Sequence, residues 1–320
     1  MTVTPPPGSP AGSAPTEAFA CHRELLFGVV YGMLGTVADT EDVLRETWHD
    51  WARRPAPQED AARPRACLVR VALRHALARH DALARRREAY IGPWLPEPLV
   101  CPLEQPAGPG AAGRPAASST PGAGARAVPL ATLAALDDLS APERAVFVLA
   151  EVGGCAPGQI AEIVGRSPAA VRELAGRAAA RVEARRPRGP ADPAVRPGIT
   201  ARFAAAMRGS DPAAFRPLLA PEVMFRTDSG GKAAAACLTG VRGREQAAAL
   251  LAAGSYWPRA DPRVRRRLVN GEESLLVTAA DVPFAVLALD LDPAGGRVSG
   301  ICAVTNPDKL RGSPCQQAPT

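Results

Sequence analysis

Among the side chains that bind ligands or take part in chemistry, arginine is abundant in this sequence, whereas histidine and cysteine are few. Lys and Arg together number 38, and the only lysines are Lys232 and Lys309, whereas the four histidines all lie before residue 81. The seven cysteines, at positions 21, 67, 101, 155, 237, 302 and 315, include no C-x-x-C pair. We therefore expect no metal site, no disulfide framework, no cofactor and no catalytic residue.

Residues 157–182, PGQIAEIVGRSPAAVRELAGRAAARV, have the spacing of a helix-turn-helix. Ala161 is a small residue where two helices would touch, and Gly165 suits the turn between them. Val171 is a branched apolar residue that would fix the second helix in place. The motif predicts a DNA-reading unit.

Arginines concentrate around the second helix of this motif. Ser167 is a good N-cap and Pro168 suits the first helical position, so the two residues predict where this helix begins. Its buried stripe is predicted at Val171, Leu174, Ala175, Ala178 and Val182. Between Arg166 and Arg188 seven arginines stand against two glutamates, a balance that suits a phosphate backbone. An ordinary helical hairpin with a solvated charged face is the alternative.

The 320 residues, with 34 prolines and 29 glycines in total, predict two or three domains joined by Pro/Gly-rich linkers. No apolar run is long enough to cross a membrane, and we expect no signal peptide and a soluble, cytoplasmic protein. The expected segments are a disordered leader (1–16), a helical unit (17–100), a flexible Pro/Gly/Ala linker (101–129), a second helical unit (130–188), a linker (189–197), a unit of helices and short strands (198–312) and a tail (313–320).

The first helical unit has two halves of opposite charge. Residues 39–60 contain seven acids and three arginines, whereas residues 61–88 contain eight arginines and two acids. Such a split predicts two partners, a cationic protein surface and a nucleic acid. Trp48 and Trp51 are three residues apart on a predicted apolar stripe, which favours core packing over base stacking.

Five segments in a fixed order are informative together. They are YGMLGTVADTEDVLRETWHDW (31–51), YIGPWLPEPL (90–99), LDDLSAPERAVFVLAEVGGCAPGQIAEIVGRSPAAVRELAGRA (136–178), DSGGK (228–232) and NPDKL (306–310). They resemble extracytoplasmic-function (ECF) sigma factors of the sigma-70 family that carry a fused C-terminal SnoaL-like domain. The resemblance implies a multidomain fold: two all-α units, a sigma region 2 bundle and a sigma region 4 helix-turn-helix, followed by an α+β domain of the SnoaL-like (nuclear transport factor 2-like) kind with a curved sheet.

The resemblance also implies partners and roles. The partners are core RNA polymerase, through the clamp helices of its largest subunit and its flap, and promoter DNA. The implied polymerase-binding acids are Asp39, Glu41, Asp42 and Glu46. The implied −10 contacts are Arg63, Arg65, Arg70, Arg74 and Arg79, and the implied −35 contacts are Arg166, Ser167, Arg172, Glu173, Arg177 and Arg181. The implied regulatory positions between domains are Trp94, Leu95, Pro96, Glu97 and Pro98 with Asp228, Lys232, Asn306, Pro307, Asp308, Lys309 and Leu310.

The predicted recognition helix departs from ordinary base readout. Ala169, Gly176 and Ala180 occupy the face opposite the buried stripe, where long hydrogen-bond donors would be needed. Glu173 can accept from a cytosine amino group. We expect weak intrinsic −35 specificity, with the arginines chiefly holding phosphates.

The C-terminal unit lacks histidine, and its candidate carboxylates, Asp228, Asp281 and Asp290, are expected to be structural. The two lysines invite a specific contact, such as a pair with Glu97. The resemblance implies that this unit regulates the sigma factor in cis by docking on the WLPEP segment, without a separate anti-sigma factor and with room for a small ligand in its apolar cone. The alternatives are a one-component helix-turn-helix regulator with a ligand-sensing domain and a small-molecule enzyme with a helical appendage. The acidic stretch favours the sigma factor, since a simple repressor has no need of it.

Overall fold

The structure is a computed structural model, and it describes residues 14–53, 63–103, 128–185, 194–209, 211–232, 240–253, 262–292 and 296–311. Most of the predicted leader, of both predicted linkers and of the predicted tail lies outside these residues. Among the helices described, none is both long and apolar enough to cross a membrane.

The first helical unit consists of α1 (Ala14–Leu34), α2 (Val37–Arg53) and α4 (Pro64–Glu88). Apolar residues recur at helical spacing from Leu25 to Met33 and from Val43 to Trp51, and these two stripes face one another in its interior. Their buried members are Leu26, Val29, Val30, Met33, Val43, Leu44, Thr47 and Trp51. Trp48 is half-buried and packs edge-to-face on Phe19, with ring centroids 5.3 Å apart. Both tryptophans therefore have packing roles, as predicted.

The second helical unit consists of α5 (Leu130–Ala135), the short 3-10 helix η1 (Leu136–Asp138), α6 (Ala141–Glu151), α7 (Pro157–Val164) and α8 (Pro168–Arg185). Gly165 ends α7 with φ of 65°, a left-handed conformation that glycine adopts without strain. The Ser167 hydroxyl accepts a hydrogen bond from the Ala170 amide at 3.2 Å. These observations confirm the predicted helix-turn-helix and the predicted start of its second helix.

The two helical units share one hydrophobic core. Gly32 of α1 lies against Val148 of α6, so close that a Cβ atom at position 32 would come within 2.9 Å of a Val148 methyl group. Arg144 of α6 is completely buried, and its Nε donates to the Gly32 carbonyl at 2.9 Å. Its Nη1 donates to Asp137 at 2.7 Å, and Asp137 also accepts from Arg87 of α4. The sequence predicts separate units, whereas the structure packs them tightly together.

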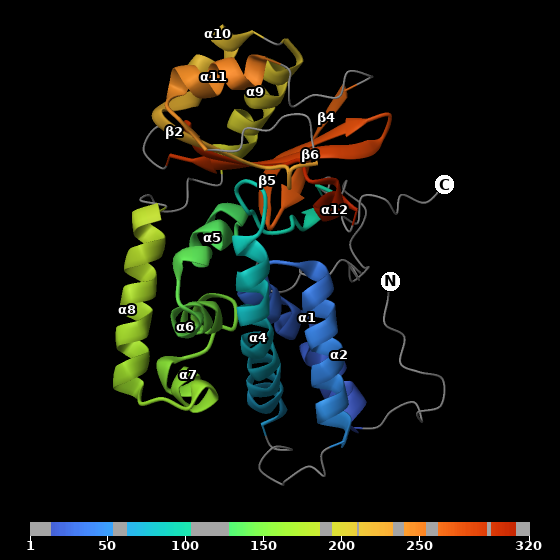
Figure 1. Cartoon of the computed structure of the whole chain (residues 1–320), viewed down its shortest axis with the longest axis vertical. Coiled ribbons are helices and arrows are strands. Elements are labelled where there is room, and N and C mark those ends of the chain that lie inside the picture. The colour runs from blue at the N-terminus through green and yellow to red at the C-terminus, as the bar shows by residue number, and fades with distance from the viewer. Residues whose placement is uncertain are drawn as a thin grey trace.

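The C-terminal unit combines helices with a seven-stranded mixed sheet. Its helical elements are α9 (Arg196–Gly209), α10 (Pro212–Phe215), the 3-10 helix η2 (Arg216–Leu218), α11 (Arg244–Ala252) and α12 (Pro307–Leu310). Its strands are β2 (Leu219–Asp228), β3 (Val241–Arg242), β4 (Pro262–Val269), β5 (Glu272–Ala279), β6 (Val282–Leu291) and β7 (Val298–Val304). Figure 1 shows α9, α10 and α11 on the sheet face that points away from the two helical units.

The seventh strand comes from outside this unit. The strand order is β1-β4-β5-β6-β7-β2-β3, in which β1 is Val100–Cys101. Val100 pairs antiparallel with Val269 at the end of β4. The β2–β7 pair is parallel, and the other neighbours are antiparallel. The segment after WLPEP thus extends the C-terminal sheet, a strand pairing that no pattern in the sequence predicts.

Each face of the sheet carries a buried apolar cluster. One face packs against α9, α10 and α11 around Phe203, Phe215 and Phe225. The other face forms a mixed cluster, which contains residues of all three parts of the chain. Its buried members are Leu95, Val100, Leu130, Ala134, Val269, Leu276, Val286, Cys302, Val304 and Leu310. The C-terminal sheet therefore touches both the WLPEP segment and α5, the first helix of the second helical unit.

Candidate functional site

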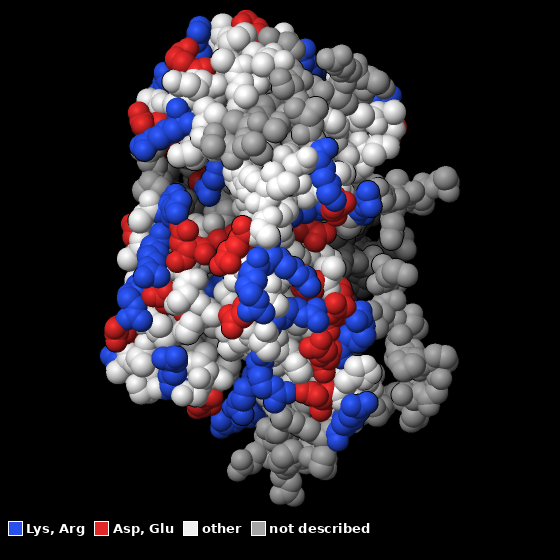
Figure 2. All heavy atoms as spheres, viewed as in Figure 1, with Lys and Arg blue, Asp and Glu red and all other residues white. Residues whose placement is uncertain are grey.

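Helix α8 carries a line of arginines, which Figure 2 shows as blue side chains along the left edge of the view. Arg177 and Arg181 turn back to Glu143 of α6, with N–O distances of 3.0 and 2.7 Å. Glu143 itself closes a capping box, since it accepts from both the amide and the hydroxyl of Ser140. One buried carboxylate thus fixes the orientation of α8 relative to α6.

The predicted recognition face is open to solvent. Ala169, Gly176 and Ala180 are exposed, as is Arg172. Glu173 forms an ion pair with Arg177 one turn further along the same helix. The small residues leave room for a close approach to a DNA backbone, and weak base preference stays a prediction.

The pKa of Glu143 is lowered to about 2, first by the hydrogen bond from the Ser140 hydroxyl and then by the Ser140 amide and Arg177. An acid whose pKa falls on folding stabilises the fold above its ordinary value of 4.5 and loses that effect as the pH falls toward 2. Glu143→Gln is therefore expected to lower the thermal midpoint at pH 7, and the difference from the wild type should shrink below pH 4.5. Circular dichroism melts across this range measure it, with exposed Glu183→Gln on α8 as control. A constant difference from pH 7 to pH 3 would contradict the assignment.

The acidic face of α2 and the basic face of α4 pair with each other. Arg79 lies among three acids, 2.9 Å from Asp42, 3.1 Å from Glu46 and 3.5 Å from Asp39. Hydrogen bonds from Arg79 and Arg45 lower the pKa of the Asp42 carboxyl. Arg79 is therefore engaged by acids of the same chain, because α2 and α4 are adjacent and bring their opposite charges together.

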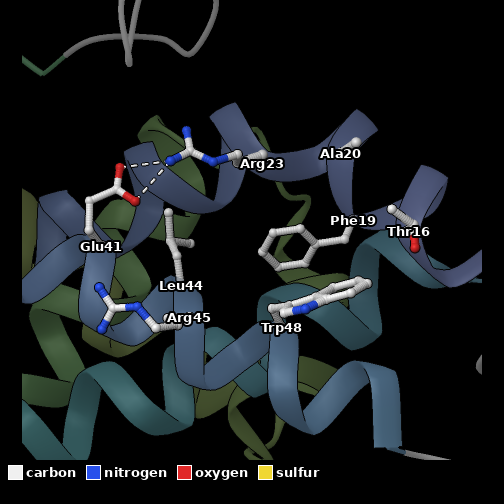
Figure 3. Close-up of a pocket in the computed structure, with 8 residues that line it drawn as sticks. All are labelled: Thr16, Phe19, Ala20, Arg23, Glu41, Leu44, Arg45 and Trp48. Carbon is white, nitrogen blue, oxygen red and sulfur yellow. Dashed lines mark hydrogen bonds and ion pairs between the residues drawn. The ribbon is translucent and has the colours of Figure 1, made fainter. Parts of the chain in front are cut away.

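Glu41 lies at the edge of a small apolar pocket between α1 and α2 (Figure 3). Both of its carboxylate oxygens accept from Arg23 at 2.8 Å. The pocket has a volume of about 150 Å³, and the rings of Phe19 and Trp48 form its apolar floor. All four acids of the predicted polymerase-binding set thus lie on α2, and each has an intramolecular cationic partner.

The other predicted −10 arginines occupy different settings along α4. Arg65 donates to the Gly153 carbonyl between α6 and α7 at 2.5 Å, and Arg74 pairs with Asp50 of α2 at 2.5 Å. Arg63 and Arg70 are exposed. Arg65 consequently ties a predicted DNA-contacting segment to the helix-turn-helix unit.

Asp228, at the end of β2, is the centre of the interdomain junction. It is fully buried and its carboxylate accepts from the Tyr90 hydroxyl at 2.5 Å, the Leu95 amide at 2.8 Å and the Lys309 ammonium at 2.6 Å. Lys309 also donates to the Leu95 carbonyl at 2.5 Å. The predicted DSGGK, NPDKL and WLPEP segments therefore meet at one point, and Asp228 has the structural role expected of it.

Aromatic rings enclose the Lys309 ammonium. Its Nζ lies 3.2 Å from the centroid of the Trp94 ring and 4.9 Å from that of Tyr90, both cation–π distances. Burial lowers the pKa of Lys309 to about 8, and Asp228 opposes this shift. Asn306 caps α12 and donates to the Tyr90 hydroxyl at 2.7 Å. Tyr90 and Trp94 thus both belong to the junction.

The predicted pairing of a lysine with Glu97 is wrong. Lys309 pairs with Asp228, and Lys232 pairs at the surface with Asp308. Glu97 instead accepts from the Val37 amide at the start of α2, at 2.8 Å, and burial raises its pKa. The sequence correctly singles out the two lysines as residues with specific contacts. It does not show which carboxylate pairs with each of them, because that depends on how the chain folds.

A second set of hydrogen bonds at the junction centres on Tyr31 and Asn270, which lie outside the DSGGK, NPDKL and WLPEP segments. The Tyr31 hydroxyl of α1 donates to the Glu97 carbonyl at 2.5 Å and accepts from the Asn270 side chain at 2.9 Å. The Asn270 amide oxygen accepts from the Leu99 amide at 3.0 Å. Asn270 and Gly271 form the tight turn between β4 and β5, which an Asn-Gly pair signals. The partners of Asn270, Tyr31 at a distance of 239 residues and Leu99 at 171, carry no such signal.

Gly230 shows why the DSGGK loop needs glycine. Its φ is 58°, and a Cβ atom there would lie 2.4 Å from the Asn306 side chain and 2.8 Å from the Tyr90 hydroxyl. Any residue larger than glycine would therefore collide with the side chains of Asn306 and Tyr90. The junction is closely packed, as a specific contact between domains requires.

Comparison with known proteins agrees with this architecture. Residues 130–182 match the family described as "Sigma-70, region 4". The chain is 34% identical over 310 residues to the ECF RNA polymerase sigma factor SigJ of Mycobacterium tuberculosis, which covers 93% of this chain and 94% of that protein. The crystal structure of M. tuberculosis SigJ superposes with a TM-score of 0.70 at 30% identity, covering 94% of this chain and 99% of the other.

The chain belongs to the ECF sigma factors of RNA polymerase. It directs transcription initiation, and it is not an enzyme. The predicted sigma factor identity is confirmed, and with it core RNA polymerase and promoter DNA as partners. The one-component regulator and the enzyme are thereby set aside.

Proposed function

We propose that the C-terminal unit regulates this sigma factor in cis by holding the two helical units in a closed arrangement. The observation that carries this proposal is the mixed cluster on the inner sheet face, where the C-terminal unit buries both the WLPEP segment and α5. Residues from the ends of both helical units are thus held by one rigid sheet. In this proposal the unit is SnoaL-like and acts in place of a separate anti-sigma factor. A small ligand bound in its apolar cone is a further part of the proposal.

Promoter geometry supports the need for opening. The −10 and −35 elements are about 25 base pairs apart, which is about 85 Å of duplex at about 3.4 Å per base pair. Arg70 of the proposed −10 segment and Arg166 of the proposed −35 unit line one and the same cleft in this structure. Residues that share a single cleft cannot contact both elements at once, so the closed arrangement is the inactive one.

The proposed contacts follow from exposure and pairing. Arg63, Arg70, Arg166 and Arg172 are the exposed arginines that we assign to DNA, and Arg79 is omitted because three acids engage it. The acids of α2 remain the proposed polymerase surface. The Arg45–Asp42 and Arg79–Glu46 pairs are solvent-exposed and are therefore inexpensive to exchange for new ones, whereas the Arg23–Glu41 and Arg79–Asp39 pairs are half-buried.

Tyr31→Phe tests the proposal with a single removed hydroxyl. The substitution leaves the Asn270 amide and the Glu97 carbonyl without their partner, which costs about 1–3 kcal/mol when such groups are buried. We expect run-off transcription with core polymerase to rise several-fold, on a promoter selected from a random library by the wild-type holoenzyme. Ser299→Ala is the control, because the Ser299 hydroxyl bonds to Asp290 inside the C-terminal unit. Equal transcription by wild type and Tyr31→Phe, despite weakened docking, would refute regulation by docking.

A further inference from the structure

A large cleft lies between the two helical units, separate from the junction. Its volume is about 820 Å³, within the range of about 300–1,000 Å³ typical of small-molecule sites. One wall is α4, and the other is formed by α6, α7, the following turn and α8. Such sites are common where two domains meet. This cleft exists only while the two helical units are packed together.

The chemistry of the walls is aliphatic with a positive rim. Leu73, Ile163 and Leu174 are among the apolar lining residues, and none of the described lining residues has an aromatic ring. Three arginines and one glutamate complete it. Arg74 is paired with Asp50, whereas for Arg70 and Arg166 the described residues provide no ion-pair partner. One cation with free hydrogen-bonding capacity therefore stands on each wall.

These features select the kind of occupant. A cleft of about 820 Å³ has the size of a small-molecule site and does not hold a DNA duplex. A single strand or a nucleotide would lack the aromatic rings on which bases stack. An alkyl chain matches the aliphatic walls, and an anionic head group matches the two guanidinium groups.

We infer that this cleft binds an amphipathic aliphatic anion, an alkyl chain ending in a carboxylate or phosphate, with its head group between Arg70 and Arg166. A ligand that contacts both walls binds the closed arrangement and not the open one. Its binding therefore shifts the population toward the closed arrangement. The binding site is independent of the proposed cis regulation, and only its effect on transcription rests on the closed-to-open change.

The test is calorimetric titration of the full-length protein with decanoate and with decyl phosphate, each below its micelle concentration. Decyl maltoside, with the same chain and a neutral head, and inorganic phosphate, without a chain, are the matched ligands. We expect both anionic ligands to bind, both controls to bind at least tenfold more weakly, and the paired substitution Arg70→Ala, Arg166→Ala to weaken anion binding at least tenfold. Arg172→Ala, an exposed arginine of α8 outside the cleft, should bind as wild type. Equal binding of decyl maltoside, or no effect of the paired substitution, would overturn the site.

The effect of ligand binding on transcription is tested by a separate measurement. Whichever of the two anions binds more tightly should inhibit run-off transcription by the wild type at concentrations where decyl maltoside does not. Binding without inhibition would overturn the inhibitory role while leaving the site. Failure of the cis regulation would look different, because junction substitutions would then leave transcription unchanged while the calorimetric results stood.

Discussion

Lys309→Met is expected to release the C-terminal unit from the WLPEP segment and to raise transcription more than any other single change at the junction. The substitution leaves Asp228 as a fully buried carboxylate without its cation, and breaking a buried ion pair in this way costs about 3–5 kcal/mol. The loss also removes the hydrogen bond to the Leu95 carbonyl and the cation over the Trp94 ring. Hydrogen exchange at the Leu95 amide reports undocking directly, and run-off transcription reports its effect.

The chain provides its own control for this experiment. Lys232→Met removes the other lysine, whose partner Asp308 is half-exposed, and exposed pairs are worth about 0–1 kcal/mol. Combining Lys309→Met with Asp228→Asn should recover part of the lost docking, because no buried charge remains unpaired. If Lys309→Met and Lys232→Met had equal effects, the buried pair would not be the determinant of docking.

Gly32→Ala is expected to open the contact between the two helical units without unfolding α1. The new methyl group would lie 2.9 Å from one Val148 methyl and 3.1 Å from the other, and overpacking of this kind costs about 1–3 kcal/mol. Alanine within a helix is itself more favourable than glycine by about 0.5–1 kcal/mol, so the first helical unit alone should not be weakened. A fluorescence energy transfer pair with one dye on each helical unit should show an increased distance, and transcription should rise.

Val148→Ala provides the matched suppressor. Removing the Val148 methyl groups makes space for the new one, so the variant with both substitutions should return toward the wild-type distance and activity. Val148→Ala alone leaves a small cavity but no clash. If Gly32→Ala were unchanged in distance, or if Val148→Ala failed to reverse it, the α1–α6 contact would not control opening.

Local signals in the sequence were sufficient to predict the helix-turn-helix. Gly165 needs a left-handed backbone and Ser167 needs a free helix N-terminus, and each requirement is visible within a few residues. The buried stripes of α1, α2 and α8 follow from helical periodicity in the same way. The resemblance to a family with three separated motifs then placed the interdomain junction near Asp228 and Lys309.

Contacts between residues far apart in the chain could not be predicted from the sequence. The Arg79 pairs with α2 depend on how two helices pack, and charge counting alone assigned the two helices to different partners. Tyr31 and Asn270 reach each other only because the C-terminal sheet sits on the end of α1. Strand β1 is two residues long, too short for any alternating pattern to be recognised.

Leu95 is held through its peptide groups as well as its side chain, since its amide binds Asp228 and its carbonyl binds Lys309. In the proposed cis regulation, the inhibitory element and its target are parts of one polypeptide in fixed one-to-one stoichiometry, with a local concentration that tethering places near the millimolar range. Release is then a first-order event whose rate does not depend on how much protein the cell makes. Resetting after a stimulus needs no synthesis, capture or degradation of another molecule.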